Sequence, residues 1–487
     1  MSAAALRSRT LLPIAALARC ALAALLAVGL GARGAAQPAP AVQPDDAAAV
    51  AWLRAAAHPF ADATPDRADT DALLQALGDA RVYGIGEATH GDHQDQSFKV
   101  ATIKALVVAG RIDTLALECN RLAATGFDAY VHGGPGDLVA LIRDPSFFRT
   151  WQDDEFAGLI LWLRAWNATA AHPVRVIGVD NQDANRDIRV ALAFLRARDP
   201  RLAAALAAPL APMLTPQAQG MKFYKWVIAT PKPAYDTATR GVQAIDAALA
   251  AHRAAWGHLP GYDDAAYSAR IAWQGLHQFD LEAGNPDVDL SGQSAEYNRR
   301  DIAMAANLVG FTDGHRAALW AHDMHVLGGL DAGIVAQGYV TMGSELRRAL
   351  GTAYVSVGFA WSEGSFNSVT MAKANSGAVA ALPDWVPQTA PNQRADDLGR
   401  VLAEVGPPRF WVDLRRVPAD QAWSGRPMYR GWSGATFNAE QWQTDPSDRI
   451  GLVPSHDVLV YFHTITPSGM WPRRPVAADV KAGGAAH

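Results

Sequence analysis

The chain has 487 residues, half of them hydrophobic, and its 43 basic and 48 acidic side chains give a formal net charge of −5. This acidic balance argues against a nucleic-acid partner, because neutralising phosphates requires a basic surface. A chain of this length can bury a large core without disulfide bonds, and its only cysteines are Cys20 and Cys119.

Residues 1–36 are typical of an export signal peptide. Arg7 and Arg9 begin it, the apolar stretch from Leu11 to Leu30 forms its core, and Gly34-Ala35-Ala36 is a small-residue cleavage site. This segment contains four arginines and no acidic residue, so the rest of the chain has 39 basic and 48 acidic side chains and a net charge of −9.

The apolar stretch is nearly long enough to span a membrane, but Pro13 and Arg19 interrupt it. We therefore expect Sec-type export, cleavage, and a periplasmic or secreted bacterial protein with no stable membrane anchor. A retained anchor is the alternative. Cleavage removes Cys20 and leaves Cys119 alone, so we expect no intrachain disulfide.

Small and polar residues at 37–46 and 476–487 predict a disordered spacer and a disordered tail. Residues 47–475 contain no linker-like stretch and predict one large body. Alternating strands and helices predict an α/β fold with a largely parallel central sheet flanked by helices. The predicted strands are 81–85, 114–117, 174–180, 317–320, 353–359, 410–414 and 458–462, and the first predicted helices are 47–58, 70–77, 98–108 and 155–166.

Residues 187–307 predict a long helical insertion in this fold. The segment is rich in alanine, and prolines break it at Pro209, Pro231, Pro260 and Pro286. Its aromatic side chains would suit a lid or side wall over the sheet, and the alternative is that they are the core of a helical subdomain. They are Tyr224, Trp226, Tyr235, Trp256, Tyr262 and Trp273.

The segment 84–93 contains the most informative motif. A short apolar run, Val82–Ile85, gives way to glycine, and Glu87 and His90 follow. A carboxylate three positions from an imidazole can orient the ring and share its proton, which is what the activation of a water molecule requires.

Three other predicted strand ends also lead into ionisable residues, namely Glu118, Asp180 and His322. Reacting groups in open α/β sheets gather where strands end, so we expect these side chains to meet Glu87 and His90 at one edge of the sheet. A lone ionisable residue at a strand end is more often a cap or a solvated charge. The prediction therefore depends on the convergence of four strand ends.

Such a set supports hydrolysis. His90 is the candidate base, because imidazole titrates near neutral pH. Glu87 or Glu118 would hold its other ring nitrogen. Lys99 or His322 would face the developing oxyanion, although a solvated surface charge is the alternative for Lys99.

Other nucleophiles have weak support in the sequence. The Gly-x-Ser-x-Gly elbow of serine hydrolases is absent, and Ser433 in Gly431-Trp432-Ser433-Gly434 is its nearest imitation. Cys119 adjoins Glu118, but strand alternation points it to the opposite face, where we expect a small buried hydrophobe.

A metal site is a second possibility. His90 and His93, and likewise His322 and His325, have ligand-like spacing, and Glu118 could complete a set. Such pairs are loose signals, and no His-Glu-x-x-His motif accompanies them. A metal-dependent hydrolase therefore stays an alternative.

The motifs together resemble those of the erythromycin esterase family over about residues 81–462. The resemblance begins with Gly86-Glu87-Ala88-Thr89-His90-Gly91 and His93, followed by Leu117-Glu118, Trp320-Ala321-His322 and His325. Further matches are Trp151, Glu155, Trp162-Leu163-Arg164, Gly178, Asp180, Arg300-Asp301, Met304, Asn307, Met342-Gly343-Ser344, Glu363-Gly364-Ser365-Phe366 and Asp413-Leu414-Arg415.

This resemblance implies a metal-independent hydrolase without a cofactor that opens the lactone ring of macrolides, a reaction of antibiotic resistance. It implies that His90 activates water, supported by Glu87, Glu118, His322 and Lys99. Beside these catalytic residues we expect a substrate-binding set. Its members are His93, His325, Asp180, Arg300 and Asp301.

Five positions depart from the family pattern. Lys99 stands where Arg is frequent and lacks its bidentate fork, Gln94 stands where an acid is common, Asp323-Met324 replaces an Asn-Ala pair, and Cys119 replaces a small residue. None removes a proposed catalytic group.

We therefore expect an exported carboxylic ester hydrolase whose partner is a small-molecule ester or lactone. Macrolides act in the cytosol, so export leaves the substrate open. The rival to any enzyme is a non-catalytic periplasmic binding or exopolysaccharide-assembly protein, whose ligand surface would be the aromatic-rich helical segment.

Overall fold

A computed structural model describes residues 44–215, 226–227, 229–280, 294–312, 314–330, 335, 338–370, 384–389, 391, 394, 396–439, 442 and 449–472. The predicted signal peptide and C-terminal tail lie outside these residues. Helix α1 (Pro44–Ala56) begins inside the predicted disordered spacer, a correction of its boundary. The reason is Asp46, which is buried and pairs with Arg400 and Arg426.

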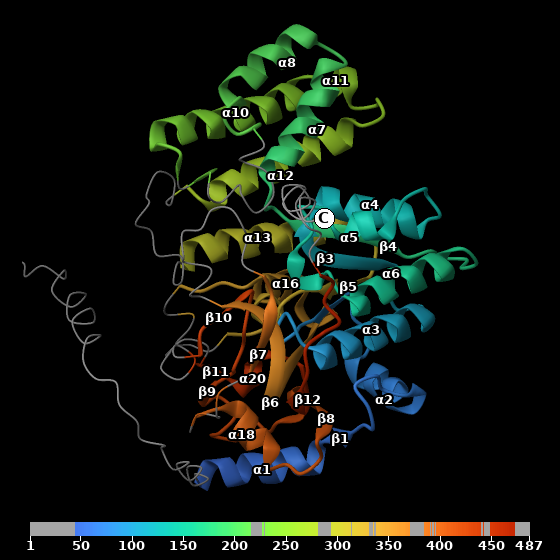
Figure 1. The fold of residues 1–487 in the computed structure, drawn as a ribbon, viewed down its shortest axis with the longest axis vertical. Helices are drawn as coiled ribbons and strands as arrows, with labels where there is room; N and C mark the ends of the chain where they lie inside the picture. Colours follow the sequence, from blue (N-terminus) through green and yellow to red (C-terminus); the bar gives the residue numbers. More distant parts are fainter. Residues whose placement is uncertain are drawn as a thin grey trace, which may run out of the picture. The chain divides into compact units, whose positions relative to one another are not determined.

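The central element is a mixed, mostly parallel sheet flanked by helices, as the sequence predicted (Figure 1). Within the described residues it has ten strands in the order β1-β8-β12-β6-β2-β5-β3-β4, with β7 and β10 paired to β6. From β12 to β4 neighbouring strands run parallel, whereas β8 is antiparallel to both β12 and β1. The strands are β1 (His58–Pro59), β2 (Val82–Ile85), β3 (Thr114–Asn120), β4 (Arg175–Asp180), β5 (Ala317–Trp320), β6 (Tyr354–Thr370), β7 (Val386–Thr389), β8 (Arg409–Asp413), β10 (Thr436–Phe437) and β12 (Val458–Ile465), and a small second sheet pairs β9 (Pro427–Tyr429) with β11 (Arg449–Gly451).

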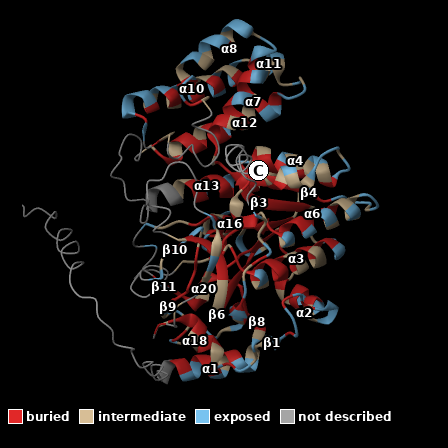
Figure 2. Ribbon diagram, in the orientation of Figure 1, coloured by how far each residue is buried: buried red, intermediate tan, exposed pale blue. Residues whose placement is uncertain are grey.

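Helices cover both faces of the sheet, and Figure 2 shows the strands buried between them. Alternate residues of one strand enter different cores: Tyr83 and Ile85 join the cluster under α2, α3, α4 and α6, and Val82 joins the cluster under α13 and α16. The helices are α2 (Arg67–Leu77), α3 (His93–Val108), α4 (Arg121–Val131), α5 (Leu138–Ile142), α6 (Asp154–Asn167), α7 (Ala184–Arg196), α8 (Pro200–Ala207), α10 (Lys232–Ala251), α11 (Arg253–Trp256), α12 (Tyr262–Gln278), α13 (Ser294–Phe311), α14 (Asp323–Val326), α16 (Met342–Leu350), α18 (Leu398–Ala403) and α20 (Leu452–Ser455), with short 3-10 turns η2 (Arg149–Trp151), η3 (Ala208–Leu210), η6 (Gly351–Ala353) and η7 (Leu414–Arg416).

The predicted helical insertion divides into two parts. Helices α7, α8, α10 and α12 share a hydrophobic cluster of their own, in which Tyr235 and Tyr262 are buried. Helix α13 instead packs on the sheet through Met304 and Leu308. These tyrosines therefore belong to the core of a helical subdomain, the alternative that the sequence left open, while Tyr224 lies outside the described residues.

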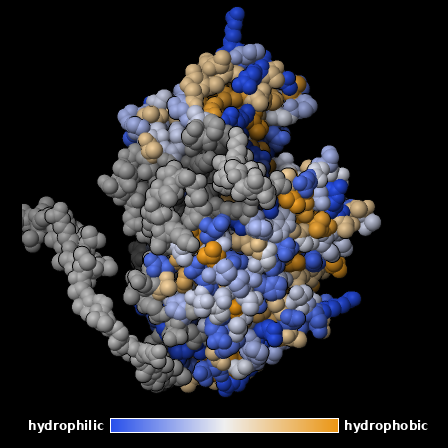
Figure 3. All heavy atoms as spheres, in the orientation of Figure 1, coloured by the Kyte–Doolittle hydropathy of each residue, from blue (hydrophilic) through white to orange (hydrophobic). Residues whose placement is uncertain are grey.

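The surface drawn in Figure 3 intersperses hydrophilic and hydrophobic side chains. Exposed large apolar residues such as Val108 and Leu161 are normal in number for a folded chain. Over the described residues, no helix combines the length and the hydrophobicity that crossing a bilayer requires.

The loop after β2 is packed so closely that two of its glycines have no room for a side chain. A β-carbon at Gly86 would lie 1.8 Å from Oδ1 of Asp323, and one at Gly91 would lie 2.0 Å from the carbonyl oxygen of Asn367 on β6. The second clash is with backbone, which cannot move aside as a side chain does. Glu87 and His90 lie between the two glycines, so these contacts fix their loop against α14 and β6.

We expect Gly91→Ala to lower the free energy of unfolding by about 1–3 kcal/mol, the range for overpacking a tight site. Gly158→Ala is the control, because Gly158 is exposed on α6 and a β-carbon there meets nothing within 4 Å. That change should stabilise the helix by about 0.5–1 kcal/mol. Urea unfolding measures both, and equal effects would show that the Gly91 contact does not constrain the loop.

Candidate active site

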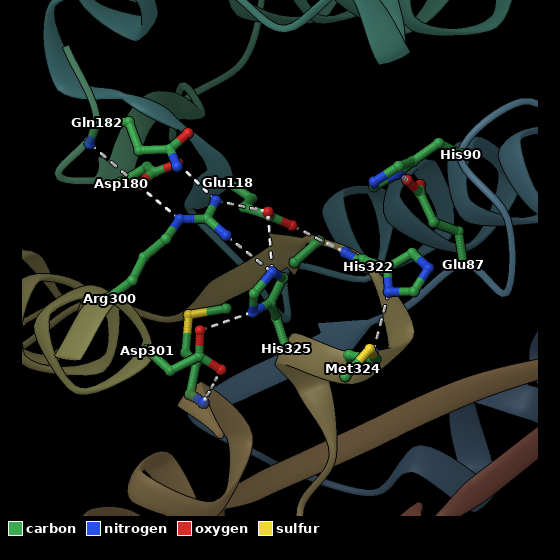
Figure 4. Close-up of polar contacts among 12 residues, drawn as sticks. Glu87, His90, Glu118, Asp180, Gln182, Arg300, Asp301, His322, Met324 and His325 are labelled. Carbon is green, nitrogen blue, oxygen red and sulfur yellow. Dashed lines mark hydrogen bonds and ion pairs between the residues drawn. The ribbon is translucent and has the colours of Figure 1, made fainter. Parts of the chain in front are cut away.

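Four neighbouring strands end at the same edge of the sheet and bring the predicted residues together. Glu87 and His90 follow β2, His322 follows β5, Glu118 lies near the end of β3, and Asp180 ends β4. Figure 4 shows these side chains around a common centre, with His322 between the Glu87–His90 pair and Glu118. Strand β3 continues through Glu118 to Asn120, beyond the predicted end at residue 117.

Glu87 is fully buried and holds His90 in place. Its Oε1 lies 2.5 Å from Nδ1 of His90 and accepts a hydrogen bond of 2.9 Å from Nε1 of Trp151. Its Oε2 accepts from Nε2 of Gln96 at 2.9 Å and from the ammonium group of Lys99. Burial favours the neutral acid, but Lys99 and His90 outweigh it and lower the pKa of Glu87 to about 2. The carboxylate is therefore ionised at neutral pH.

Lys99 lies inside the protein and not on its surface, so the solvated alternative for this residue is wrong. Its ammonium group is fully buried, pairs with Glu87, and lies 3.3 Å from the carbonyl oxygen of Ala321. It also lies 4.3 Å from the ring centroid of Trp320, a cation–π contact. Lys99 therefore balances the charge of Glu87, and its role toward an oxyanion stays a prediction.

His322 is a neutral hydrogen-bond donor. Its Nδ1 accepts the backbone N–H of Met324 at 3.2 Å, so the proton of the neutral ring lies on Nε2. Burial and the neighbouring His90 lower the pKa of His322 to about 3 from 6.5. Nε2 is buried, has no hydrogen-bond partner among the described residues, and belongs to a ring whose centroid lies 4.8 Å from that of His90. The ring therefore presents a free N–H donor beside His90.

This lowered pKa also affects the folded state. The unfolded chain binds a proton at His322 below about pH 6.5, whereas the folded chain does so only near pH 3. The native state therefore loses stability as the pH falls through this window.

Glu118 is the centre of a buried network of charges. Its Oε2 accepts the backbone N–H of His322 at 3.0 Å, and its Oε1 accepts from Nη2 of Arg300 at 2.8 Å and lies 3.2 Å from Nε2 of His325. Despite the opposing effect of burial, His325 and Arg300 hold the pKa of Glu118 well below its usual range. Arg300 also binds both oxygens of Asp180, at 3.1 and 2.6 Å.

The remaining member of the network, Asp301, connects the site to α16. Its Oδ1 lies 2.7 Å from Nδ1 of His325, and its Oδ2 accepts the backbone N–H of Met342 at 2.8 Å. Burial opposes a charge on His325, but Asp301 and Glu118 raise its pKa to about 10. Asp180, Arg300, Asp301 and His325 therefore form the support of Glu118 (Figure 4). Whether they also contact a substrate stays a prediction.

His93 has a different partner. It begins α3, its side chain is 46% exposed, and its Nδ1 lies 2.6 Å from Oε1 of Glu155. The structure thus pairs His90 and His93 with separate carboxylates. No set of three or more His, Cys, Asp and Glu side chains in the described part of the chain gathers in a way that could hold a metal ion.

Ser433 lies closer to the site than its position in the sequence suggests. It forms a parallel bridge with Thr89: its N–H donates to the carbonyl of Ala88 at 3.0 Å, and its carbonyl lies 3.4 Å from the N–H of His90. Its hydroxyl oxygen is buried and has no hydrogen-bond partner among the described residues.

Several contributors were not predicted as site residues. Gln96 and Trp151 bind Glu87 directly. Asp323 is buried, donates its N–H to the carbonyl of Glu87 at 3.0 Å, and accepts from Phe359 N at 2.8 Å and Trp432 Nε1 at 3.1 Å. Trp151 and Asp323 did stand out in the motif comparison, but Gln96 and Trp432 gave no local signal.

A family model described as erythromycin esterase matches residues 111–465, nearly three quarters of the chain. The chain belongs to the erythromycin esterase family. Family membership supports hydrolase activity at a general level. Glu118, Asp180, Arg300 and His322 lie inside the matched residues, whereas the Glu87–His90 loop precedes them.

Three solved structures are similar to this chain and have the erythromycin esterase-like fold. A Bacillus cereus protein matches with a TM-score of 0.70 at 22% identity, over 88% of this chain and 99% of its own. A succinoglycan biosynthesis protein matches with a TM-score of 0.69 at 17% identity, over 88% of this chain and all of its own. A mutant of the erythromycin esterase EreC in its open conformation matches with a TM-score of 0.64 at 16% identity, over 84% of this chain and 97% of its own. At these identities the likeness shows the fold alone.

We expect Arg300→Met to lower the free energy of unfolding by about 3–5 kcal/mol, because it leaves the buried carboxylates of Glu118 and Asp180 without their shared counter-charge. Arg348→Ala is the control, since Arg348 pairs with Glu345 at the surface and should leave the unfolding midpoint unchanged. Urea unfolding at neutral pH measures both. Equal midpoints would contradict the supporting role of Arg300.

Proposed function

We propose that this protein hydrolyses a carboxylic ester or a lactone with a water molecule that His90 activates, without a covalent acyl-enzyme. One observation carries the proposal. Nδ1 of His90 is held by the ionised Glu87, and the ring faces His322, whose Nε2–H has no partner among the described residues. A base and a donor therefore lie side by side, and neither of their reactive nitrogens has a hydrogen-bond partner in the described part of the chain.

The first step needs His90 with its proton on Nδ1. Glu87 accepts that N–H and leaves Nε2 free to take a proton from water. The hydroxide equivalent attacks the carbonyl carbon, and the carbonyl π electrons move to oxygen. Glu87 stabilises the imidazolium that forms, and it can do so because Lys99, Gln96 and Trp151 keep it ionised and oriented.

The second step returns the proton. The Nε2–H of His322 donates to the oxyanion of the tetrahedral intermediate, and its low pKa ensures that it does so as a neutral group. When the carbonyl reforms, the C–O bond to the alcohol breaks, and the alkoxide takes the proton from His90. An ester gives an acid and an alcohol, and a lactone gives one hydroxy acid.

The absence of a Gly-x-Ser-x-Gly elbow from the sequence favours water over a serine nucleophile. A metal-dependent reaction is the rival, and chelation separates it from the reaction proposed here.

We propose further that the protein acts outside the cytosol, on a bulky ester or lactone. The basic start, apolar core and small-residue site of residues 1–36 support export. A macrolide is one candidate substrate, and an acylated saccharide is another. Both belong in the same panel, because the site recognises the ester carbonyl.

The test is mass spectrometry of erythromycin, simple esters and acetylated oligosaccharides after incubation with the mature protein, with and without a chelator. We expect a gain of one water that survives chelation. His90→Ala should lower the rate at least about a hundredfold, the lower range for loss of a general base. His172→Ala is the control, because His172 is exposed on a loop.

Three outcomes would contradict the mechanism. Loss of activity on chelation would favour the metal-dependent reaction. A covalent adduct with an organophosphonate at any serine would replace direct water attack by an acyl-enzyme. Stoichiometric binding without turnover of any panel member would favour the binding protein.

The donor role of His322 has its own test. His322→Ala should lower kcat about a hundred- to a thousandfold, as expected when an oxyanion donor is removed. His322→Gln keeps a neutral N–H donor and should retain more activity. Because the pKa of His322 is about 3, the acid limb of the pH–rate profile should keep its position in His322→Gln. A shifted limb would mean that His322 itself titrates during catalysis.

A further inference from the structure

Strand β6 reaches well beyond the edge of the sheet where the site lies. It is 17 residues long, and its first part pairs with β2 from Tyr354 to Val357. Its outer part, Ser365 to Ser368, pairs antiparallel with β7. Strand β7 therefore lies past the ends of β2 and β5, on the side of the sheet edge where His90 and His322 project.

Backbone hydrogen bonds fasten this outer part to the loop that carries His90. The N–H groups of Asn367 and Ser468 both donate to the carbonyl of Gly91, each at 2.9 Å, and the Asn367 side chain donates to the carbonyl of Ser468 at 3.0 Å. Gly91 directly follows His90. The position of β7 relative to His90 is thus set by main-chain contacts.

Trp385, the residue before β7, lies against His90. The centroids of the two rings are 6.4 Å apart, with the planes inclined by 59°. Two further indoles approach the imidazole pair, Trp151 at 6.2 Å from His90 and Trp432 at 6.3 Å from His322. Both are buried and donate their N–H groups to carboxylates, whereas Trp385 is only half-buried. Trp385 therefore presents ring surface next to the reacting nitrogens.

We infer that Trp385 determines substrate specificity in the proposed esterase by packing against an apolar ring next to the ester carbonyl. The inference rests on the proposed function and adds a substrate class to it, ring-bearing esters and lactones. An indole offers a large, flat, rigid surface, and an apolar ring that packs on it is removed from water. In the proposed reaction His90 acts on the water and His322 on the carbonyl oxygen, so neither distinguishes a ring-bearing ester from a small one. The surface of Trp385 does.

The experiment compares methyl acetate with methyl cyclohexanecarboxylate, two methyl esters whose acyl group is a methyl in one and a cyclohexyl ring in the other. We expect Trp385→Ala to raise KM for the ring-bearing ester about tenfold, or about 1.4 kcal/mol, and to leave its kcat within about twofold. For methyl acetate, kcat/KM should change by less than about twofold. Trp385→Phe should restore most of the affinity, because it restores an aromatic face.

Trp256→Ala is the matched control, since Trp256 is also half-buried but lies in the helical subdomain, stacked on His252. It should leave both esters unaffected. Unfolding midpoints of all variants establish that they fold. If Trp385→Ala does not fold, Trp385→Gln decides the question, because it removes the aromatic face and keeps a side chain of intermediate size.

The outcomes separate this inference from the function on which it rests. Equal losses for both esters in the Trp385 variants would overturn the inference and leave the esterase intact. A selective loss in Trp256→Ala would place the ring surface in the helical subdomain and would also overturn it. If the wild-type protein hydrolyses neither these esters nor the larger panel, the proposed function fails, and the inference fails with it.

Discussion

A single ionised carboxylate, that of Glu87, organises the site. Burial alone would neutralise it, and Lys99 and His90 reverse that preference. Trp151 and Gln96 also donate hydrogen bonds to its oxygens. The pKa values of the neighbouring acids Asp92 and Asp323 shift in the opposite direction. Burial raises the pKa values of Asp92 and Asp323 to about 7, and the charge of Glu87 contributes to both shifts. The ammonium group of Lys99 thus pairs with Glu87, and the negative charge lies on the carboxylate that binds His90.

A second buried ion cluster orients the other half of the site. Glu118 shares Arg300 with Asp180 and holds the backbone N–H of His322. Each imidazole is therefore anchored to a different carboxylate, His90 through its ring and His322 through its main chain. The difference matters chemically, because the carboxylate of Glu87 fixes the proton of the neutral His90 ring on Nδ1, whereas the His322 ring has only a backbone partner among the described residues and stays neutral. Two residues of the same type can then serve as base and as donor.

Much of the fold could be predicted from the sequence, because strands buried on both faces are continuous apolar runs. The run ending at Trp320 predicted β5 to the residue, and the convergence of Glu87, Glu118, Asp180 and His322 followed from the rule for strand ends. The spacing of His90 and His93 suggested that the two rings share a site, but they have different partners. Asp92 caps α3 there, and the helix that begins at His93 directs the ring to Glu155 instead of to the partner of His90.

The unpredicted parts of the site come from segments without a local signal. Gln96 looks like any polar residue in the first turns of a helix, and its role depends on the direction in which α3 leaves the loop. Trp385 and Trp432 reach the site through pairing with β6 and through a bond to Asp323, contacts between positions far apart in the chain. Sequence periodicity reports which face of an element is buried, and it carries no information on such long-range contacts.

Lys99 connects the loop that carries Glu87 and His90 to the segment that carries His322. Its ammonium group binds Glu87 after β2 and approaches the carbonyl of Ala321 at 3.3 Å, immediately before His322 at the end of β5. Trp320 occupies the space beside it at 4.3 Å. The compact ammonium group fits between the indole and the carboxylate, a geometry that differs from the planar fork of an arginine. The ammonium group that keeps Glu87 ionised therefore also connects the loop of His90 to the loop of His322.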